Sequence, residues 1–221
     1  SPDGKTLVTG GADAQLRYWS LAKGEPSGAP LPTDFSVTSL VFNPAGTILA
    51  ASCAQSLNQG RTVLWDAATR DRLGPPHSYE AEKLTAVNHV SFQPGGILMA
   101  SCGSLLDGRG KGGRAMWDTF QRNLHSRIEF PAAQTQVAFS RNGETLITGG
   151  VDRSVRFWDV STQESLCPPI WHSFNIGRLA CSPRRDTVFT LAFGDFLREW
   201  ELPRRRFTTH ATAAAGAQSP K

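Results

Sequence analysis

The sequence predicts an all-β fold built from about five repeated, four-stranded antiparallel units. Five tryptophans recur at the same place in successive segments, and a tight-turn signal precedes each of them. The segments between turn and tryptophan are short apolar and β-branched runs, and no amphipathic helical period is visible. Because the first two signals occur five times in register, the prediction depends on the whole pattern and not on any single copy.

The tryptophans define the period of the repeat. They end the segments LRYWS, TVLWD, RAMWD, VRFWD and LREWE, at Trp19, Trp65, Trp117, Trp158 and Trp200. Successive tryptophans are 46, 52, 41 and 42 residues apart. A four-stranded blade of a β-propeller produces a period of about 40 to 45 residues, whereas coiled coils and short solenoids repeat faster. The units are therefore expected to be propeller blades.

Each unit carries a turn tetrad upstream of its tryptophan. The tetrads are SPDG, NPAG, QPGG, SRNG and SPRR, at residues 1–4, 43–46, 93–96, 140–143 and 182–185. Proline sets φ for a tight turn, and glycine or asparagine accepts positive φ, so the tetrads indicate hairpins.

Strands are expected on both sides of every tetrad. The inner strand of a blade is expected before it, at Val37–Phe42, Val87–Phe92, Gln136–Phe139 and Leu179–Cys181. Two further strands are expected after it, as at Thr6–Thr9 followed by Gln15–Trp19, Ile97–Ala100, and Thr145–Thr148 followed by Ser154–Trp158.

These residues resemble the WD-repeat (beta-transducin-like) family, whose unit runs from an inner strand through a Ser-Pro-Asp-Gly turn to a strand ending in Trp-Asp. The resemblance covers residues 1 to about 202 and is strongest in the first and fourth units. Trp-Asp is present at Trp65, Trp117 and Trp158, but Trp19 is followed by serine and Trp200 by glutamate. The resemblance implies a rigid, non-catalytic scaffold that binds a protein or peptide.

The resemblance also implies a buried hydrogen-bond network of Trp, Ser or Thr, Asp and His. The first unit matches with Thr9, Asp13 and Trp19, and the fourth with Thr148, Asp152 and Trp158. His172 lies ahead of the fifth inner strand, but Gly194 occupies the aspartate position of that unit, so its network is expected to be incomplete.

The expected organisation is propeller blades over residues 1–202 and a basic, Ala/Thr-rich tail over 203–221, disordered beyond about Thr209. Ser1 falls inside a turn, so we expect an incomplete first blade and a C-terminal part of a longer propeller. Gly74–His77 and Cys167–His172 also resemble linkers of large bacterial WD-repeat proteins, which implies a regulatory or targeting part of a bacterial signalling protein. Four widely spaced cysteines fit neither a disulfide framework nor a zinc site, and a cytoplasmic location is expected.

Unequal loop lengths suggest where a partner would bind. The stretch from the residue before the turn tetrad to the tryptophan spans 19 residues in the fourth and fifth units, but 23 in the second and 25 in the third. A further insertion falls near residues 77–83. These loops are expected on one face of the disc and predict a partner-binding rim, although lengthening without function is the equal alternative. Its residues are Asn58, Arg61, His77, Tyr79, Glu82, Arg109, Lys111 and Arg114.

Other chemistry is weakly supported. Residues 107–114 form a glycine-rich basic run, but they lack the spacing of a phosphate-binding loop. No catalytic, cofactor or metal residues are predicted, and neither a membrane nor a small molecule is expected as partner. Two alternatives remain open. One is an enzymatic propeller with a site in the central channel, for which the candidates are Asn88, His89, Gln136 and Arg178. The other is nucleic-acid or anion binding through basic loops and the tail, with Arg204–Arg206 and Lys221.

Overall fold

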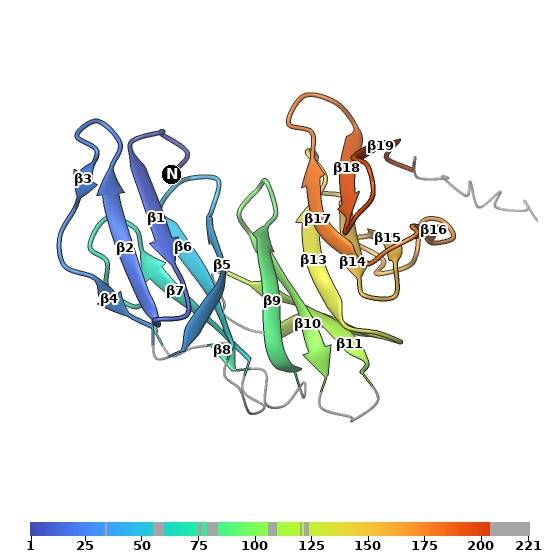
Figure 1. Ribbon diagram of the computed structural model, residues 1–221, viewed down its shortest axis with the longest axis horizontal. Coiled ribbons are helices and arrows are strands. Elements are labelled where there is room, and N and C mark those ends of the chain that lie inside the picture. Colours follow the sequence, from blue (N-terminus) through green and yellow to red (C-terminus); the bar gives the residue numbers. More distant parts are fainter. Residues whose placement is uncertain are drawn as a thin grey trace, which may run out of the picture.

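The computed structural model describes residues 1–33, 35–54, 60–74, 77–78, 84–105, 110–119, 121 and 124–203. Nineteen strands, β1 to β19, and no helix occur within these ranges, which confirms the all-β prediction (Figure 1). In the part of the chain so described, no helix is long and apolar enough to cross a membrane.

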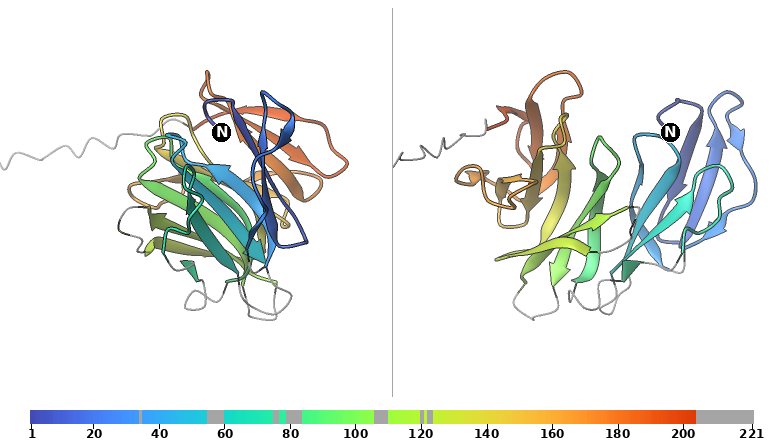
Figure 2. Two further views of the ribbon diagram at one scale, coloured as in Figure 1. Left: turned by 90° about the vertical axis from the view of Figure 1, so that its left-hand side faces the viewer. Right: turned by 180° about the vertical axis from the view of Figure 1, so that it is seen from behind.

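The strands form five blade-like units, here called blades I to V. Blades II and III are linked into one sheet by a single pair, Ala54 with Ala86. Figures 1 and 2 show the units following one another in an arc with blades I and V at its two ends. The strands of blade I are β1 (Thr6–Gly10), β2 (Gln15–Ser20), β3 (Glu25–Pro26) and β4 (Leu31–Pro32); of blade II, β5 (Ser36–Phe42), β6 (Ile48–Ala54), β7 (Arg61–Asp66) and β8 (His77–Ser78); of blade III, β9 (Leu84–Phe92), β10 (Leu98–Leu105), β11 (Gly112–Asp118) and β12 (Leu124–Phe130); of blade IV, β13 (Gln134–Phe139), β14 (Thr145–Gly150), β15 (Ser154–Asp159) and β16 (Ile170–Trp171); and of blade V, β17 (Ile176–Cys181), β18 (Thr187–Ala192) and β19 (Arg198–Glu201).

Neighbouring strands within each blade are antiparallel, as expected for propeller blades. Blade I differs from the others because, among the described residues, β1 pairs only with β2 and no inner strand lies beside it. Its outer side is formed by two very short strands, β3 and β4, which both pair with β2.

The turn tetrads form the hairpins that the sequence predicts. In the first four, the fourth residue is a glycine with φ between 68° and 73°, and its amide donates to the carbonyl of the first residue. The fifth tetrad ends in arginine, which does not favour positive φ. There the Arg185 amide donates to the Ser182 hydroxyl at 3.1 Å, so a side chain replaces the backbone acceptor.

The hydrophobic core lies between the blades. Leu16 and Tyr18 of blade I pack with Trp65 of blade II in one buried cluster, and three further clusters fill the junctions II–III, III–IV and IV–V. At the last junction, Phe157 of β15 packs in a cluster with Val188 of β18, both fully buried. Fully burying one such side chain contributes about 1.5–3 kcal/mol, so each blade is stabilised mainly by its neighbours.

A repeated hydrogen bond ties the inner strands together. β5, β9 and β13 each have a bulge four positions before the phenylalanine that ends the strand, and we call the residues at these bulges the clasps: Thr38, Asn88 and Thr135. Their side chains donate to the inner strand of the following blade, at Val87 O (2.6 Å), Gln134 O (2.8 Å) and Ile176 O (2.7 Å). The equivalent residue of β17 is Gly177, which has no side chain to donate.

The bulge also accounts for inner strands that begin earlier than expected. β9 starts at Leu84, not Val87, and β17 starts at Ile176, not Leu179. Pairing resumes on the far side of the extra residue, so the strand continues where the simple alternation of side chains breaks down.

Candidate partner-binding edge

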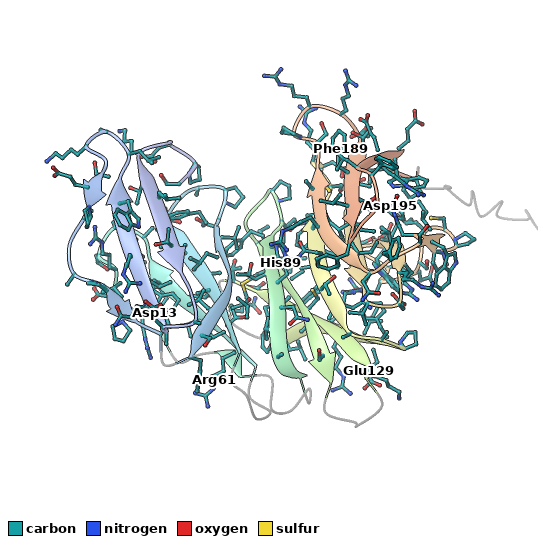
Figure 3. All side chains as sticks on the ribbon, in the orientation of Figure 1. Asp13, Arg61, His89, Glu129, Phe189 and Asp195 are labelled. Atoms are coloured by element: carbon teal, nitrogen blue, oxygen red, sulfur yellow. The ribbon has the colours of Figure 1, made fainter. Side chains whose placement is uncertain are left out.

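The described turns that join the second and third strands, in blades I, IV and V, lie along one edge with the neighbouring connections into an inner strand. Figure 3 shows Asp13, Arg61 and Glu129 at this edge, below the sheets. Backbone hydrogen bonds join turn to connection: the Val37 amide donates to Gly11 O at 3.0 Å, and the Phe193 amide donates to Asn175 O at 3.0 Å. We call this side of the molecule the turn edge.

Half of the predicted rim falls outside the described residues, namely Asn58, Tyr79, Glu82 and Arg109. His77 is placed only as a residue of β8. Arg61 and Lys111 are both partly exposed, and the Arg61 guanidinium lies 5.0 Å from the centre of the Phe35 ring. The partner-binding rim over blades II and III therefore stays a prediction.

Arg114 does not lie on the rim. It is the third residue of β11 and only 1% exposed, because its side chain points into the junction between blades III and IV. One guanidinium nitrogen donates to Gln163 Oε1 at 2.7 Å, and the group lies 5.5 Å from the Trp158 ring centre. Burial lowers the pKa of Arg114 to about 10. A loop count from the sequence missed this position because β11 begins two residues earlier, at Gly112.

The network residues of blades I and IV lie together in pairs. The Trp19 indole N–H donates to Thr9 Oγ1 at 3.0 Å, and Trp158 donates to Thr148 Oγ1 at 3.1 Å. The aspartates face arginines instead. Asp13 accepts from Arg17 at 2.6 Å, which lowers the pKa of its carboxyl, and Asp152 lies 2.8 Å from Arg156.

Blade V has a longer network than the sequence predicts. The Trp200 indole donates to Thr190 Oγ1 at 2.9 Å, and the same hydroxyl lies 3.2 Å from His172 Nε2. His172 Nδ1 in turn lies 3.8 Å from Asp195 Oδ2, and Arg198 donates to that carboxylate at 2.9 Å. Burial lowers the pKa of His172, which favours the neutral ring.

The network of blade V was expected to be incomplete because Gly194 stands at the aspartate position of the repeat. The aspartate is in fact present one residue later, at Asp195. Gly194 adopts φ of 74° in the β18–β19 turn, and the Asp195 amide donates to Ala192 O at 3.1 Å. This turn carries the carboxylate one position later than the turn at Asp152 does. Sequence reasoning also missed Thr190 and Trp200 as members, although their ten-residue spacing equals that of Thr148 and Trp158.

The channel-side candidates have separate surroundings. Asn88 is a clasp, and Gln136 is 4% exposed on β13. Burial lowers the pKa of His89, with a smaller effect in the same direction from the Arg178 guanidinium. In the described ranges, no three His, Cys, Asp or Glu residues are grouped closely enough to hold a metal ion.

Two parts of the chain are similar to a known family of repeats. The model of the family described as "WD domain, G-beta repeat" matches residues 1–20 and 125–159, which are the first unit and most of the fourth. With four-stranded blades and Trp–Thr pairs, the molecule has the architecture of a WD-repeat β-propeller. WD-repeat proteins are in general protein-interaction scaffolds.

Curated relatives match over most of the chain. It is 26% identical to the U5 small nuclear ribonucleoprotein 40 kDa protein of Dictyostelium discoideum, over 73% of this chain and 42% of the relative. It is 26% identical to human Striatin-4, over 85% of this chain and 25% of the relative. It is 23% identical to the methylosome protein WDR77 of Xenopus laevis, over 76% of this chain and 50% of the relative. The chain thus spans between a quarter and a half of the length of these relatives.

Proposed function

We propose that this chain is a non-catalytic scaffold that binds a protein or peptide along its turn edge. The observation that carries the proposal is the way the turn edge is supported. Buried cores and clasp hydrogen bonds join successive blades, so turns from different blades are held in fixed relation. A fixed array of turns lowers the entropic cost of ordering a binding surface.

The relatives support the same proposal at a coarser level. Two of them carry names that refer to assemblies, a small nuclear ribonucleoprotein and a methylosome. Our proposal for this chain extends to a regulatory or targeting part of a larger bacterial signalling protein in the cytoplasm.

Selection of peptide ligands tests the proposal. The immobilised chain would be screened against a phage-displayed library of random peptides, and enriched peptides would be synthesised with a fluorescent label for anisotropy titrations. Binding should be lost in variants of the turn edge and retained by Ile97→Ser, which changes a half-exposed side chain of the opposite edge. Failure to enrich any peptide, together with tight binding of a random-sequence DNA or RNA oligonucleotide, would favour the nucleic-acid alternative.

A further inference from the structure

Large exposed apolar side chains gather where blades IV and V meet the turn edge. Six residues, which we call the corner patch, come from the β14–β15 turn, the end of β16 with its connection to β17, and the segment that follows β18. Their exposed fractions range from 40% to 86%, although isolated exposed hydrophobic residues are more usual on a protein surface. The members are Val151, Trp171, Phe174, Phe193, Phe196 and Leu197.

The segments of the corner patch are held in place by backbone hydrogen bonds. The His172 amide donates to Arg153 O at 2.8 Å, which fixes the start of the connection on the β14–β15 turn. The Phe193 amide donates to Asn175 O at 3.0 Å, which fixes its end on blade V. The network of His172 and Asp195 lies directly beneath, so the patch is a preorganised surface.

The patch lies partly on turns and partly on the outer face of blade V. Leu197 continues the apolar side of that face together with Leu191, which is 39% exposed. Phe174 and Phe196 belong to a connection and a turn, and they are 52% and 86% exposed. Phe174 and Phe196 are exposed because they lie on the turn edge, and their exposure does not depend on what adjoins the outer face of blade V.

Charge around the patch is unbalanced. The carboxylates in the two turns of the patch are already bound: Asp152 by Arg156 at 2.8 Å, and Asp195 by Arg198 at 2.9 Å. The exposed Glu199 lies further along β19. Arg178 is exposed, and its guanidinium donates to the carbonyl of the preceding residue, Gly177, at 2.9 Å. Within the described ranges, neither Arg178 nor the exposed Arg153 has a carboxylate partner. The surface therefore combines apolar area with uncompensated positive charge.

A pocket of about 390 Å³ opens beside Arg178. It is lined by Gly177, Arg178, Leu191, Ala192, Phe193, Gly194 and Asp195. Gly177 occupies the position where other inner strands carry a clasp side chain, and this leaves room next to the Phe193 ring. The volume lies near the lower end of the range for ligand pockets, about 300–1,000 Å³, and suits one bulky side chain.

We propose that the corner patch docks an acidic peptide segment of a partner protein, with one aromatic or leucine side chain in the pocket and a neighbouring carboxylate on Arg178. Charge complementarity selects this occupant: the patch offers an apolar anchor site next to the Arg178 guanidinium, which has no carboxylate partner among the described residues. Guanidinium binds carboxylate with two parallel hydrogen bonds, which makes Arg178 the specificity-determining residue. The inference rests on the function proposed above and locates its main contact on blades IV and V.

Two corner variants and two matched controls test the docking site. Arg178→Glu reverses the proposed charge, and the double variant Phe193→Ser with Phe196→Ser removes apolar area. Arg141→Glu and Ile97→Ser make the same kinds of change at the opposite edge, where both side chains are exposed. All changes are at exposed positions, and equal thermal midpoints would show that folding is intact.

The expected result is enrichment of peptides that place an aromatic residue or leucine close to Asp or Glu. Both corner variants should weaken binding of these peptides by about tenfold or more, which is the effect of roughly 1.4 kcal/mol. The controls should change the affinity by less than about twofold.

Three outcomes would overturn the proposal. Enriched peptides without carboxylates would remove the role of Arg178. Peptide binding that survives both corner variants but is lost in Arg61→Glu with Lys111→Glu would keep the scaffold function and place the site on blades II and III. Self-association in sedimentation velocity, abolished by the double phenylalanine variant, would show that a second copy occupies the patch.

Discussion

Replacing Thr190 by valine should destabilise the protein much more than the same change at Thr9. Valine keeps the shape of threonine but removes the hydroxyl. At Thr190, which is fully buried, this leaves both the Trp200 indole N–H and the His172 ring nitrogen without their partner. Each unsatisfied buried polar group costs about 1–3 kcal/mol, so for two groups we expect a loss of about 2–6 kcal/mol in the free energy of unfolding.

The other two Trp–Thr pairs give an internal scale. Thr148 is fully buried and has one partner, Trp158, so Thr148→Val should cost about 1–2 kcal/mol. The Trp19–Thr9 pair is exposed to water, which can replace the lost bond, so Thr9→Val should cost less than about 0.5 kcal/mol. Thr190→Ser removes the methyl group but keeps the hydroxyl, so it serves as the control that retains both hydrogen bonds.

Urea unfolding followed by tryptophan fluorescence would measure the order, provided that the slope m is unchanged between variants. Hydrogen exchange would show whether the loss is local to blade V, since neighbouring blades of a repeat protein can open separately. Equal effects of Thr190→Val and Thr9→Val would contradict the argument, because burial would then not decide the cost of the missing hydroxyl.

Three further predictions follow from buried titratable groups. Arg114→Leu should leave the free energy of unfolding unchanged or raise it by about 1–3 kcal/mol in urea titrations. The reason is that an apolar side chain replaces a buried cation that has no carboxylate partner among the described residues. A marked loss of stability would show that Arg114 is an essential link between blades. Because burial lowers the pKa of His172, the unfolded chain binds a proton that the folded chain refuses, so stability should fall as pH drops through about 6.5. His172→Gln should flatten that fall in thermal midpoints measured between neutral and mildly acidic pH, and an unchanged slope would refute the assignment. Cys53 and Cys102 are fully buried, and burial raises the pKa of the Cys102 thiol. Both thiols should therefore react with an aromatic disulfide reagent only after denaturation. Rapid labelling of the native protein, located by mass spectrometry, would show that the I–II or the III–IV junction opens.

The repeat was predictable because each of its signals has a local physical cause. Proline and glycine set the backbone of the first three turns, and tryptophan marks the third strand of every blade, so spacing alone indicates the architecture. The clasps could not be predicted in the same way. A threonine or asparagine in a strand carries no local sign that it bulges, and the acceptor of Thr38 lies 49 residues away.

Errors in the predicted sites arose from single-residue geometry. Arg114 follows a basic, glycine-rich run and so suggests an exposed loop, but its place in β11 turns it into a blade junction. Asp195 was overlooked because the turn at Gly194 moves the carboxylate by one position relative to Asp152. Such shifts depend on backbone conformation in a turn, which the repeat period does not determine.

Stability and recognition are connected at the corner of blades IV and V. The Asp195 carboxylate accepts from the Phe196 amide at 2.8 Å and from Arg198, and it faces His172 beneath the patch. Among the described residues, the most exposed aromatic side chain, Phe196, thus follows directly after a residue anchored in the buried network. An anchored turn loses little conformational entropy when a peptide binds. Disrupting the network at His172 should therefore lower both the stability of blade V and the affinity of the corner patch for peptide. A change at the surface, such as Phe196→Ser, should lower the affinity for peptide without lowering stability.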